Sequence, residues 1–565
     1  MTRQEVATLL RQYAVLLDLL DEDAFRARAF DNAARSLEAQ TDTLDVLISE
    51  NRLAAIRGIG KGLAAAIQEI HSGGTFAELE AARQRVPEGV LDLLRIEGLG
   101  PKKAKTLWRE AGVTSLDELG AALNSGQVAK LSGFGAKTAE KFRASLAFVR
   151  TVADRHWRHH AERAANTVYD TFRSLTGVKE VFIGGSYRRG CETVGDLDVL
   201  FIAETAHHDS LFQQILNSSG FRWTETGDNF RGTTESGFPV ELSLVAPQFA
   251  AVRKVVVTGS KSHVLQLQSI ANRRGISFGK DNSASTEEAV YASLGLAYVP
   301  PPLRESAATI LPTGAPPFPT PVALSDLRGI LHCHTTASDG HHTLREMAKA
   351  MIARGYEYMG IADHSQIAAY ARGLSPDRVH RQWDEIDELN RELAPFRILK
   401  GTEVDILSDG TLDFADELLS GFDFVVASIH SGFGMTEDEA TARLCTALAN
   451  PHVDILGHPT GRLLLERNGY PINHRKVIEC AARNGKAIEL NCSPHRLDLD
   501  WRWLSLCEEM RVPVPLCPDA HQIEGLWDIR FGIEVAAKGP LTAANCPSAW
   551  NVEQFLSWCR SHEIV

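Results

Sequence analysis

The sequence predicts a multidomain α/β protein with a helical N-terminal region, a central region of strands and helices, and a C-terminal barrel of parallel strands. Helical periodicity broken by glycines runs through residues 1–150. A proline-dense segment follows residue 300, and short apolar runs that end in histidine or a carboxylate recur after residue 326. A chain of 565 residues is too long for one hydrophobic core, so several domains are expected.

Composition excludes several classes of protein. The chain is 44% hydrophobic and 23% charged, the values of an ordinary soluble protein. No apolar run reaches the ~18 residues of a membrane span, and the charged start MTRQEVATLLRQ is not a signal peptide. The nine cysteines contain no CxxC pair, which argues against a disulfide framework. We therefore expect a cytoplasmic monomer with no membrane partner.

A glycine motif occurs three times in the N-terminal region, as IRGIGKG, LRIEGLGPKKA and LSGFGAKTA. Each copy places two glycines before a helix, so backbone N–H groups at the helix start can face a phosphate. Residues 93–150 add ten lysines and arginines against five acids, within a chain of net charge −13. The copies resemble helix-hairpin-helix motifs, which hold the DNA backbone without reading its sequence. The residues expected to contact DNA are Gly58, Gly60, Gly98, Gly100, Lys102, Lys103, Gly133, Gly135 and Lys137.

The central stretch VFIGGSYRRGCETVGDLDVLFIA predicts a strand, a Gly-Ser turn with two arginines, and a second strand that carries Asp196 and Asp198. Side chains alternate along a strand, so both carboxylates lie on one face. Such a pair can hold two Mg²⁺ or Mn²⁺ ions for in-line phosphoryl transfer. The turn can bind a nucleoside triphosphate through backbone N–H groups and a guanidinium. The expected nucleotide-binding residues are Gly185, Ser186, Arg189 and Gly195.

This stretch resembles the palm signature of family X DNA polymerases, within the nucleotidyltransferase superfamily. The similarity continues through FPVELSLV, TGSKSH and TEEAVYASLGLAYVPPPLRE, and with the C-terminal region it covers nearly the whole chain in the arrangement of the bacterial members. The resemblance implies DNA, gapped or with a 3′ end, and deoxynucleoside triphosphates as partners. It also implies that Glu241 is the third metal-binding carboxylate of the palm.

Several residues depart from the pattern of that family. Glu241 stands where the family has aspartate, and the additional methylene moves the charge by about 1.5 Å, a displacement that can cost ~100-fold in a positioned site. Val256 and Val257 replace an aromatic pair. Val264 and Gln268 occupy positions where asparagine and arginine face the nascent base pair in the family. These departures predict a weakened gap-filling polymerase.

A proline-rich linker separates the central and C-terminal regions. Eight of the 23 prolines fall between Pro300 and Pro321, which favours an extended spacer. The predicted domains are a helical DNA-binding domain at 1–92, a helix-hairpin-helix fingers region at 93–150, a palm at 151–245, a thumb at 246–305, the linker at 306–325 and the C-terminal domain at 326–565.

After the linker, seven apolar runs each end in a polar residue, which predicts a distorted (β/α)7 barrel with its site at the C-terminal ends of the strands. Histidines and carboxylates without cysteine suit Mn²⁺ or Zn²⁺. The pattern resembles the PHP (polymerase and histidinol phosphatase) phosphoesterase domain, which holds three metals. By that resemblance the metals take, in turn, His332, His334, Glu403 and Asp519; Glu403, His430 and His458; and Asp339, His364 and His521.

The complete ligand set beside a substituted palm predicts a DNA repair enzyme in which Mn²⁺-dependent 3′-5′ exonuclease or 3′-end phosphoesterase activity is strong and synthesis is weakened. Bound metals would supply the nucleophile by lowering the pKa of water toward ~7. Arg462 and Arg372 are expected to bind substrate phosphate. Two alternatives stay open: an efficient gap-filling polymerase of base excision repair with PHP proofreading, and a non-catalytic DNA-binding scaffold.

Overall fold

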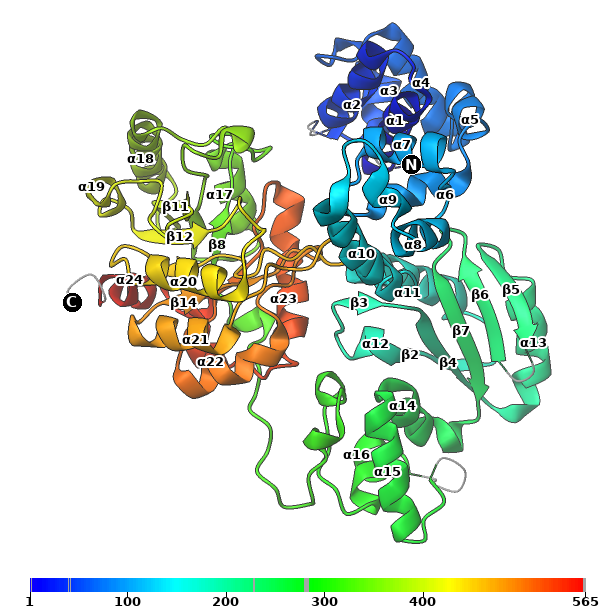
Figure 1. Ribbon diagram of the computed structural model, residues 1–565. Coiled ribbons are helices and arrows are strands. Elements are labelled where there is room, and N and C mark those ends of the chain that lie inside the picture. The colour runs from blue at the N-terminus through cyan, green and yellow to red at the C-terminus, as the bar shows by residue number, and fades with distance from the viewer. Residues whose placement is uncertain (2, 39, 41, 227–228, 279–283, 562–565) are drawn as a thin grey trace. The chain divides into compact units, whose positions relative to one another are not determined.

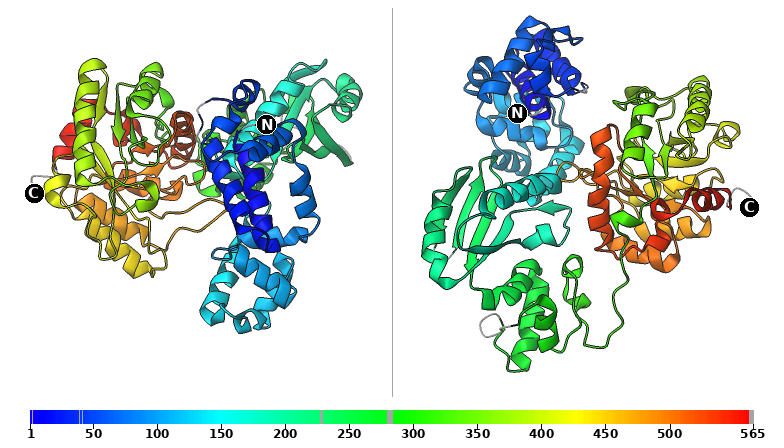
Figure 2. Two further views of the ribbon diagram at one scale, coloured as in Figure 1. Left: turned by 90° about the horizontal axis from the view of Figure 1, so that it is seen from above. Right: turned by 180° about the vertical axis from the view of Figure 1, so that it is seen from behind.

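The computed structural model describes residues 1, 3–38, 40, 42–226, 229–278 and 284–561, and the chain divides into two compact units, Met1–Ala153 and Asp154–Val565 (Figures 1 and 2). Among these described residues, no helix combines the length and the apolar character that a membrane crossing requires.

The first unit contains only helices and turns in its described residues, as the glycine-broken periodicity predicts. Its first helices pack around an aromatic cluster in which the ring of Tyr13 meets Phe30 and Phe76 edge-on, at centroid distances of 4.7 and 5.0 Å. The α-helices are α1 (Arg3–Leu20), α2 (Ala24–Glu38), α3 (Leu44–Ser49), α4 (Lys61–Gly73), α5 (Ala77–Arg83), α6 (Glu88–Asp92), α7 (Pro101–Ala111), α8 (Leu116–Asn124), α9 (Gln127–Lys130) and α10 (Gly135–Thr151).

A five-stranded sheet begins the second unit, with strand order β2-β4-β7-β6-β5. Its strands pair antiparallel except β4 and β7, which run parallel. Val199 and Phe201 face a core formed with α11, while Leu200 and Ile202 pack on the other face with Val257 of α14. The elements are β1 (His156–Trp157), α11 (Arg158–Phe172), β2 (Val178–Ile183), α12 (Gly185–Arg188), β3 (Thr193–Val194), β4 (Leu197–Ala203), α13 (His208–Leu216), β5 (Phe221–Thr226), β6 (Asn229–Thr234) and β7 (Pro239–Val245).

Three helices follow the sheet: α14 (Ala250–Thr258), α15 (Lys261–Arg273) and α16 (Glu287–Ser293). A buried ionic network ties them to the turn after β2, because Glu287 binds both Arg304 and Arg188, with N to O distances of 2.9 and 2.6 Å. The proline-rich segment then runs without helix or strand from residue 315 to 323, as expected of a spacer. Its end is fixed to the barrel, since Val322 N–H donates to Leu541 O at 2.8 Å.

The C-terminal part is a barrel of short parallel strands with helices around it (Figure 1). The seven predicted runs are all present, but two of them break into a pair of strands, so the described residues form nine strand segments. Isolated bridges between His364 and Glu403, and between Cys333 and Ala520, link the resulting small sheets. The strands are β8 (Gly329–Cys333), β9 (Tyr358–Ile361), β10 (Arg397–Leu399), β11 (Gly401–Asp405), β12 (Phe424–Ser428), β13 (Ile455–Leu456), β14 (Ala487–Ile488), β15 (Leu490–Asn491) and β16 (Leu516–Cys517).

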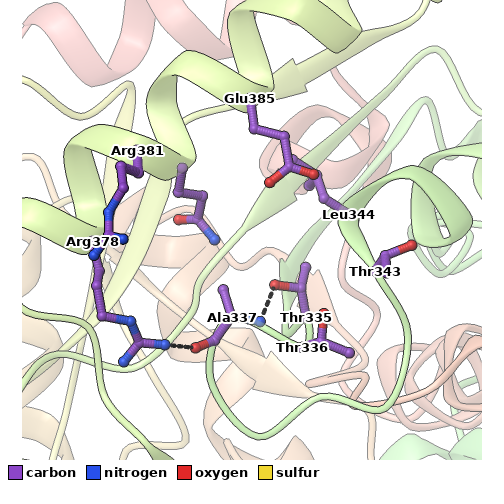
Figure 3. Close-up of a pocket in the computed structure, with 9 residues that line it drawn as sticks. Thr335, Thr336, Ala337, Thr343, Leu344, Arg378, Arg381 and Glu385 are labelled. Atoms are coloured by element: carbon purple, nitrogen blue, oxygen red, sulfur yellow. Dashed lines mark hydrogen bonds between the residues drawn. The ribbon is translucent and has the colours of Figure 1, made fainter.

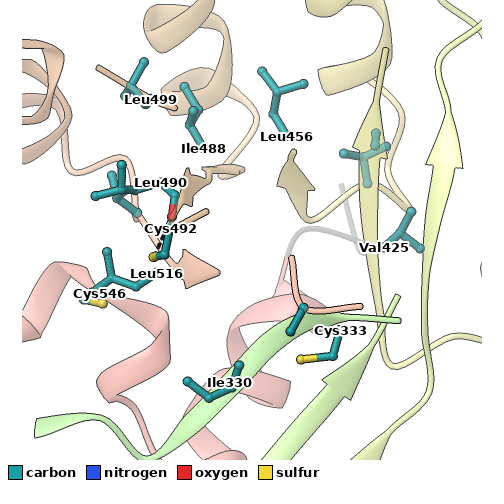
Figure 4. Packing of buried hydrophobic residues seen from close by; sticks show 14 of the residues in the cluster. Ile330, Cys333, Val425, Leu456, Ile488, Leu490, Cys492, Leu499, Leu516 and Cys546 are labelled. Atoms are coloured by element: carbon teal, nitrogen blue, oxygen red, sulfur yellow. Dashed lines mark hydrogen bonds between the residues drawn. The ribbon is translucent and has the colours of Figure 1, made fainter. Parts of the chain in front are cut away.

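The barrel core is apolar and contains several cysteines. Figure 4 shows Cys333 and Cys492 among Ile330, Leu490 and Leu516, all of which are fully buried. The surrounding helices are α17 (Leu344–Ala353), α18 (Pro376–Glu392), α19 (Asp416–Leu419), α20 (Glu437–Leu448), α21 (His474–Arg483), α22 (Leu504–Met510), α23 (Ile529–Ala536) and α24 (Val552–Ser561).

Helix α23 of the barrel contacts helix α11 through charged residues. Glu534 pairs with the buried Arg158 at the start of α11, and Arg530 pairs with Glu162 on the same helix at 2.7 Å. Asp528 is the N-cap residue of α23, and burial together with the nearby charge of Glu162 raises its pKa to about 7. The ionised form of this carboxyl is therefore disfavoured in the folded protein.

This raised pKa makes a pH-dependent prediction. Because folded Asp528 binds a proton more tightly than unfolded Asp528, its contribution to stability falls as the pH rises from about 4 to about 7. We expect Asp528→Asn to match the wild type near pH 4, where the carboxyl is protonated in the folded state and still partly protonated in the unfolded state, and to exceed its stability by ~2 kcal/mol at pH 8, measured by thermal unfolding.

A matched control is Asp500→Asn, because Asp500 pairs with Arg462 at 2.7 Å and its pKa is lowered rather than raised. That variant should lose stability at pH 8. A benefit of Asp528→Asn that stays the same from pH 4 to pH 8 would contradict the prediction.

Candidate functional site

The structure brings all nine predicted barrel ligands together at the C-terminal ends of the strands. Most lie near or just after the end of a strand, because parallel barrel strands share that edge, whereas Glu403 is in the middle of β11 and Asp339 is six residues beyond β8. Ligand atoms of eight of them form three groups, each within 4.8 Å: His334, Asp339, His364 and His521; His332, His334 and Asp519; and His364, Glu403 and His430. The grouping differs from the expected one in that His334 and His364 each belong to two groups, Glu403 belongs to one and His458 to none.

Glu403 is the central carboxylate of the barrel site. It is 1% exposed, and its oxygens lie 2.9 Å from His458 Nε2, 3.2 Å from His430 Nε2, 3.0 Å from His364 Nδ1 and 3.4 Å from His332 Nε2. A single buried carboxylate among four imidazoles can bridge neighbouring cations. Within the three groups Glu403 belongs to one, with His364 and His430, so its expected sharing between two metals stays a prediction.

The donor set fits divalent cations. Buried ring nitrogens without a hydrogen-bond partner, within the described part of the chain, include Nε2 of His332, both nitrogens of His334 and Nδ1 of His364. Although burial alone would lower it, the charge of Glu403 raises the pKa of His430 to about 10. The field that favours a proton on this imidazole also favours a metal cation in its place. Imidazole and carboxylate ligands suit Mn²⁺ or Zn²⁺.

Three carboxylates that sequence reasoning missed orient these ligands. Glu489 accepts a hydrogen bond from His332 Nδ1 at 2.5 Å, and Asp405 lies 3.2 Å from His430 Nδ1. Such partners fix the ring orientation and the tautomer of a ligating histidine. Glu489 lies in the run KAIELN, in which the sequence prediction considered the last residue, Asn491. The carboxylate two residues before Asn491 could have been recognised from the sequence.

Asp363 is the third missed carboxylate and holds the loop that carries His334 and Asp339. Its oxygens accept hydrogen bonds from the N–H and hydroxyl of Thr335, at 2.8 and 2.7 Å, and from the hydroxyl of Ser338. Gln382 of α18 donates to it at 2.6 Å. The loop is therefore fixed by a buried carboxylate beside His364 in addition to the hydrogen bonds of its own turns, such as that from Gly340 N–H to Thr335 O at 2.9 Å.

A cavity of about 420 Å³ lies on the far side of the same loop and is drawn in Figure 3. The loop residues Thr335 and Thr336 form one wall, and Arg378 and Arg381 of α18 form another. Figure 3 shows Arg378 donating a hydrogen bond to Ala337 O, which closes one end. None of the nine candidate ligands lines this cavity, so it is separate from the candidate metal centre.

Three of the candidate ligands have a positive φ: 58° at His332, 54° at Asp519 and 20° at His458. The values at His332 and Asp519 lie in the left-handed region, which costs free energy in a residue with a side chain. His332 Nδ1 is held by Glu489, and Asp519 Oδ1 lies 3.1 Å from His334 Nε2. The strained backbone therefore occurs at residues whose side chains must be oriented toward the other candidate ligands.

The two arginines expected to bind phosphate differ in their surroundings. Arg462 donates from its three nitrogens to Arg496 O, Leu497 O and Asp500, which favours a structural role. Arg372 is exposed on the loop after His364. Arg496 was not singled out from the sequence, yet its Nε lies 3.8 Å from Asp519 Oδ2, at the edge of the metal centre.

A second candidate site lies on the five-stranded sheet, at the start of β4. Asp198 and Glu241 are direct neighbours in the parallel pair of β4 and β7, so their side chains share a face. Asp196 lies just before β4, which begins at Leu197, and not within the strand as predicted. Burial, followed by the charges of Asp196 and Glu241, raises the pKa of Asp198 to about 7. Carboxylates of this kind suit Mg²⁺ or Mn²⁺, although in the described structure the three do not form one of the groups whose ligand atoms all lie within 4.8 Å of one another.

The predicted phosphate-binding turn lies against Asp198. Gly185 has a φ of 61°, and a side chain there would place Cβ 1.9 Å from Asp198 Oδ2, so only glycine fits. Arg189 is near enough for its charge to lower the pKa of Asp198. The expected residues Ser186 and Gly195 flank this region on the same turn and on the approach to β4.

The departures from the polymerase pattern have structural consequences. Glu241 is drawn toward β6, since Arg231 Nε donates to its Oε2 at 3.2 Å and Asn229 Nδ2 to its Oε1 at 3.4 Å. Val256 and Val257 line a cavity of about 120 Å³ together with Asp198 and Glu241. The valine side chains thus leave space beside the carboxylates.

The three glycine hairpins form as expected in the first unit. Gly58, Gly98 and Gly133 take left-handed φ values of 90°, 75° and 83°, which turn the chain into the following helix. The starts of α4 and α7 are capped by Gly60 and Gly100 without any side-chain hydrogen bond. Their first N–H groups are therefore available to a phosphate.

Models of known families match successive parts of the chain. A helix-hairpin-helix domain matches residues 1–76 and a SAM-like helix-hairpin-helix tandem matches 90–146. The DNA polymerase beta palm matches 155–224, which ends before Glu241, and the DNA polymerase beta thumb matches 255–305. The PHP domain matches 331–493.

Individual proteins are similar over the same regions. The chain is 36% identical to the DNA polymerase/3′-5′ exonuclease PolX of Bacillus subtilis over an alignment of 585 positions, gaps included. The alignment covers 98% of this chain and 99% of that protein. The barrel region is 37% identical over 165 residues to a probable phosphatase of Acetivibrio thermocellus, which covers 28% of this chain and 63% of that protein. A probable phosphatase of Caldanaerobacter subterraneus is 33% identical over 175 residues, 30% of this chain and 64% of its own. With its helix-hairpin-helix region, polymerase palm and thumb, and PHP barrel, the chain belongs to the PolX family of DNA polymerases.

Proposed function

We propose that the PHP barrel of this polymerase hydrolyses phosphodiester bonds at the 3′ end of DNA with Mn²⁺ as cofactor, and that synthesis by the palm is weakened. The observation that carries the proposal is the set of nine candidate ligands in the barrel, among which five histidines lie within 3.7 Å of Glu403. The similarity to the B. subtilis protein, whose name includes 3′-5′ exonuclease, supports it. The proposal keeps the expectation of a monomeric, cytoplasmic enzyme of DNA repair.

The residues of the barrel divide the work of hydrolysis. Bound divalent ions would supply a Lewis acid and a nucleophile at neutral pH. His332, His334 and Asp519 would hold one ion, with Glu489 fixing the ring of His332. Arg496, beside Asp519, is placed to bind the phosphate under attack. No protein general base is required by this arrangement.

The same site suggests how a DNA end is positioned. Tyr370 is 70% exposed, and its ring centroid lies 6.2 Å from that of His364 and 6.4 Å from that of His430. An exposed aromatic ring beside the metal centre can stack on a nucleobase. We infer that Tyr370 supports the base at the DNA end.

Tyr370→Ala is expected to raise KM for 3′-end hydrolysis of single-stranded DNA by ~10-fold, which corresponds to the loss of one stacking contact. Hydrolysis of bis-p-nitrophenyl phosphate, which has no nucleobase, should be unchanged. The measurement is steady-state kinetics on both substrates. Ile367→Ala, which removes another exposed apolar side chain from the same loop, is the control. Equal losses on both substrates would assign Tyr370 to the metal centre itself.

Synthesis by the palm remains the second candidate function. It is favoured by the carboxylates of Asp196 and Glu241, whose charges act on Asp198, and by the glycine turn against Asp198. The two functions are separated by one gel on a 5′-labelled primer annealed to a gapped template, with Mn²⁺ and four deoxynucleotides. Shortening of the primer that is lost in His332→Ala supports the proposed hydrolysis. Shortening that survives His332→Ala excludes the barrel as its source, and extension to the length of the gap would show efficient synthesis.

A further inference from the structure

Lys538 is a buried charge with no part in the functions proposed above. It follows α23 of the barrel, and its side chain has no exposed surface. Its ammonium donates to Glu305, to Arg189 O at 3.3 Å and to Cys191 Sγ at 3.7 Å. A lysine is costly to bury unless it is paired, so these partners hold it in place. They join the barrel to the phosphate turn of the palm.

Glu305 is shared between two cations. Its Oε1 accepts from Lys538, lies 3.3 Å from Arg189 Nε, and accepts from the thiol of Cys191 at 2.8 Å. Although burial would raise it, the charges of Lys538 and then Arg189 lower the pKa of Glu305 to about 2. The carboxylate is therefore ionised at neutral pH, and Lys538 balances its charge from the barrel side.

Arg189 forms an ion pair with Glu305 but makes no hydrogen bond to it. Its Nη1 donates to Thr258 O at 2.9 Å, whereas its Nε is buried and makes no hydrogen bond among the described residues. The turn that carries it is closely covered by α23, since a Cβ at Gly190 would lie 3.1 Å from Glu534 O. The position of the guanidinium therefore depends on charges that the barrel supplies.

We propose that Lys538 is a positioning residue for nucleotide binding in the palm. By neutralising Glu305, it leaves the guanidinium of Arg189 available to the triphosphate of an incoming deoxynucleotide. Without Lys538, Glu305 has Arg189 as its single cationic partner, and a triphosphate must compete with that ion pair. The inference rests on the palm function described above, and it makes the PHP barrel part of the polymerase site.

The test is the affinity for dATP in the presence of Mg²⁺, measured by calorimetry on the full chain. The protein is bound to a gapped duplex with thymine as the templating base and a dideoxy-terminated primer. All proteins carry His332→Ala so that the primer end stays intact. Lys538→Met is expected to weaken dATP binding by about tenfold, the loss of roughly one charge-assisted contact. Lys538→Arg should stay within about twofold of the parent.

A second substitution separates positioning from misfolding. The double variant Lys538→Met with Glu305→Gln removes both opposite charges, so Arg189 is released again and dATP affinity should return to within about twofold of the parent. Arg530→Met is the matched control, because it breaks a different contact between α23 and the palm, the pair with Glu162. It should leave dATP affinity unchanged.

The outcomes distinguish this inference from the palm function itself. An unchanged affinity in Lys538→Met, no recovery in the double variant, or an equal loss in Arg530→Met would overturn the role of Lys538. If the parent itself shows no saturable binding of dATP, the palm function fails first, and the inference fails with it.

Discussion

Glu403→Gln is expected to lower 3′-end hydrolysis by ~1,000-fold while primer extension by the palm continues. Glu403 lies within 3.7 Å of five histidines of the centre and is the carboxylate best placed to bridge cations. Glutamine keeps the shape but removes the negative charge, so the affinity for the shared ions falls. A loss of ~4 kcal/mol in stabilisation of the transition state corresponds to this factor.

The measurement is the rate of shortening of a 5′-labelled primer in Mn²⁺, together with bound manganese per protein after dialysis. Glu385→Gln is the control, because Glu385 lines the cavity beside the ligand loop and belongs to none of the metal groups. Retention of hydrolysis and of full metal content by Glu403→Gln would exclude the barrel centre as the source of the activity.

Glu241→Asp is expected to raise gap-filling synthesis by up to ~100-fold, the scale of a catalytic group moved by about 1 Å into position. Glu241 now reaches toward β6, where Arg231 and Asn229 bind it. Aspartate is shorter by one methylene, so its carboxylate is withdrawn from Arg231 and stays beside Asp198, its neighbour across the parallel strands. An ion held between the two carboxylates is then closer to both.

Single-nucleotide incorporation into a gapped duplex, with Mg²⁺ and separately with Mn²⁺, tests this prediction. The gain should be larger with Mg²⁺, which demands stricter octahedral geometry. Asp198→Asn is the inactive control, because it removes the charge of the central carboxylate and should abolish nucleotide incorporation. No gain in Glu241→Asp would show that Glu241 already holds its ion well, and it would favour the efficient gap-filling alternative.

Local sequence was sufficient to predict a feature where one short segment contains both the secondary-structure element and its functional residues. The hairpin glycines are predictable because a left-handed φ before a helix is strongly favoured by glycine. The strand that carries Asp198 is predictable because its apolar residues alternate between two packed faces. Asp196 was placed one residue too far into that strand, since the last residue of an element is not fixed by alternation.

Partners from distant parts of the chain could not be predicted in this way. His332 was recognisable from the sequence, yet Glu489, which orients its ring, lies 157 positions away. The contact exists because closure of the barrel brings β8 close to the end of β14, and nothing in either run encodes the other. Arg462 is an opposite case. Its position close to the candidate ligand His458 in the sequence suggested a contact with substrate phosphate, but in the folded protein its guanidinium donates a hydrogen bond to Asp500.

The sequence by itself determined the order of the domains, the family and the nine histidines and carboxylates, because each depends on the spacing of residues within one strand, turn or helix. The tertiary structure alone decided which of those ligands share a group, that Glu241 leans toward Arg231, and that Lys538 meets Glu305 across 233 positions. The first depends on closure of the barrel, the second on pairing of β6 with β7 in the palm sheet, and the third on packing of the barrel against the palm. Burial of such pairs strengthens the interaction between their charges.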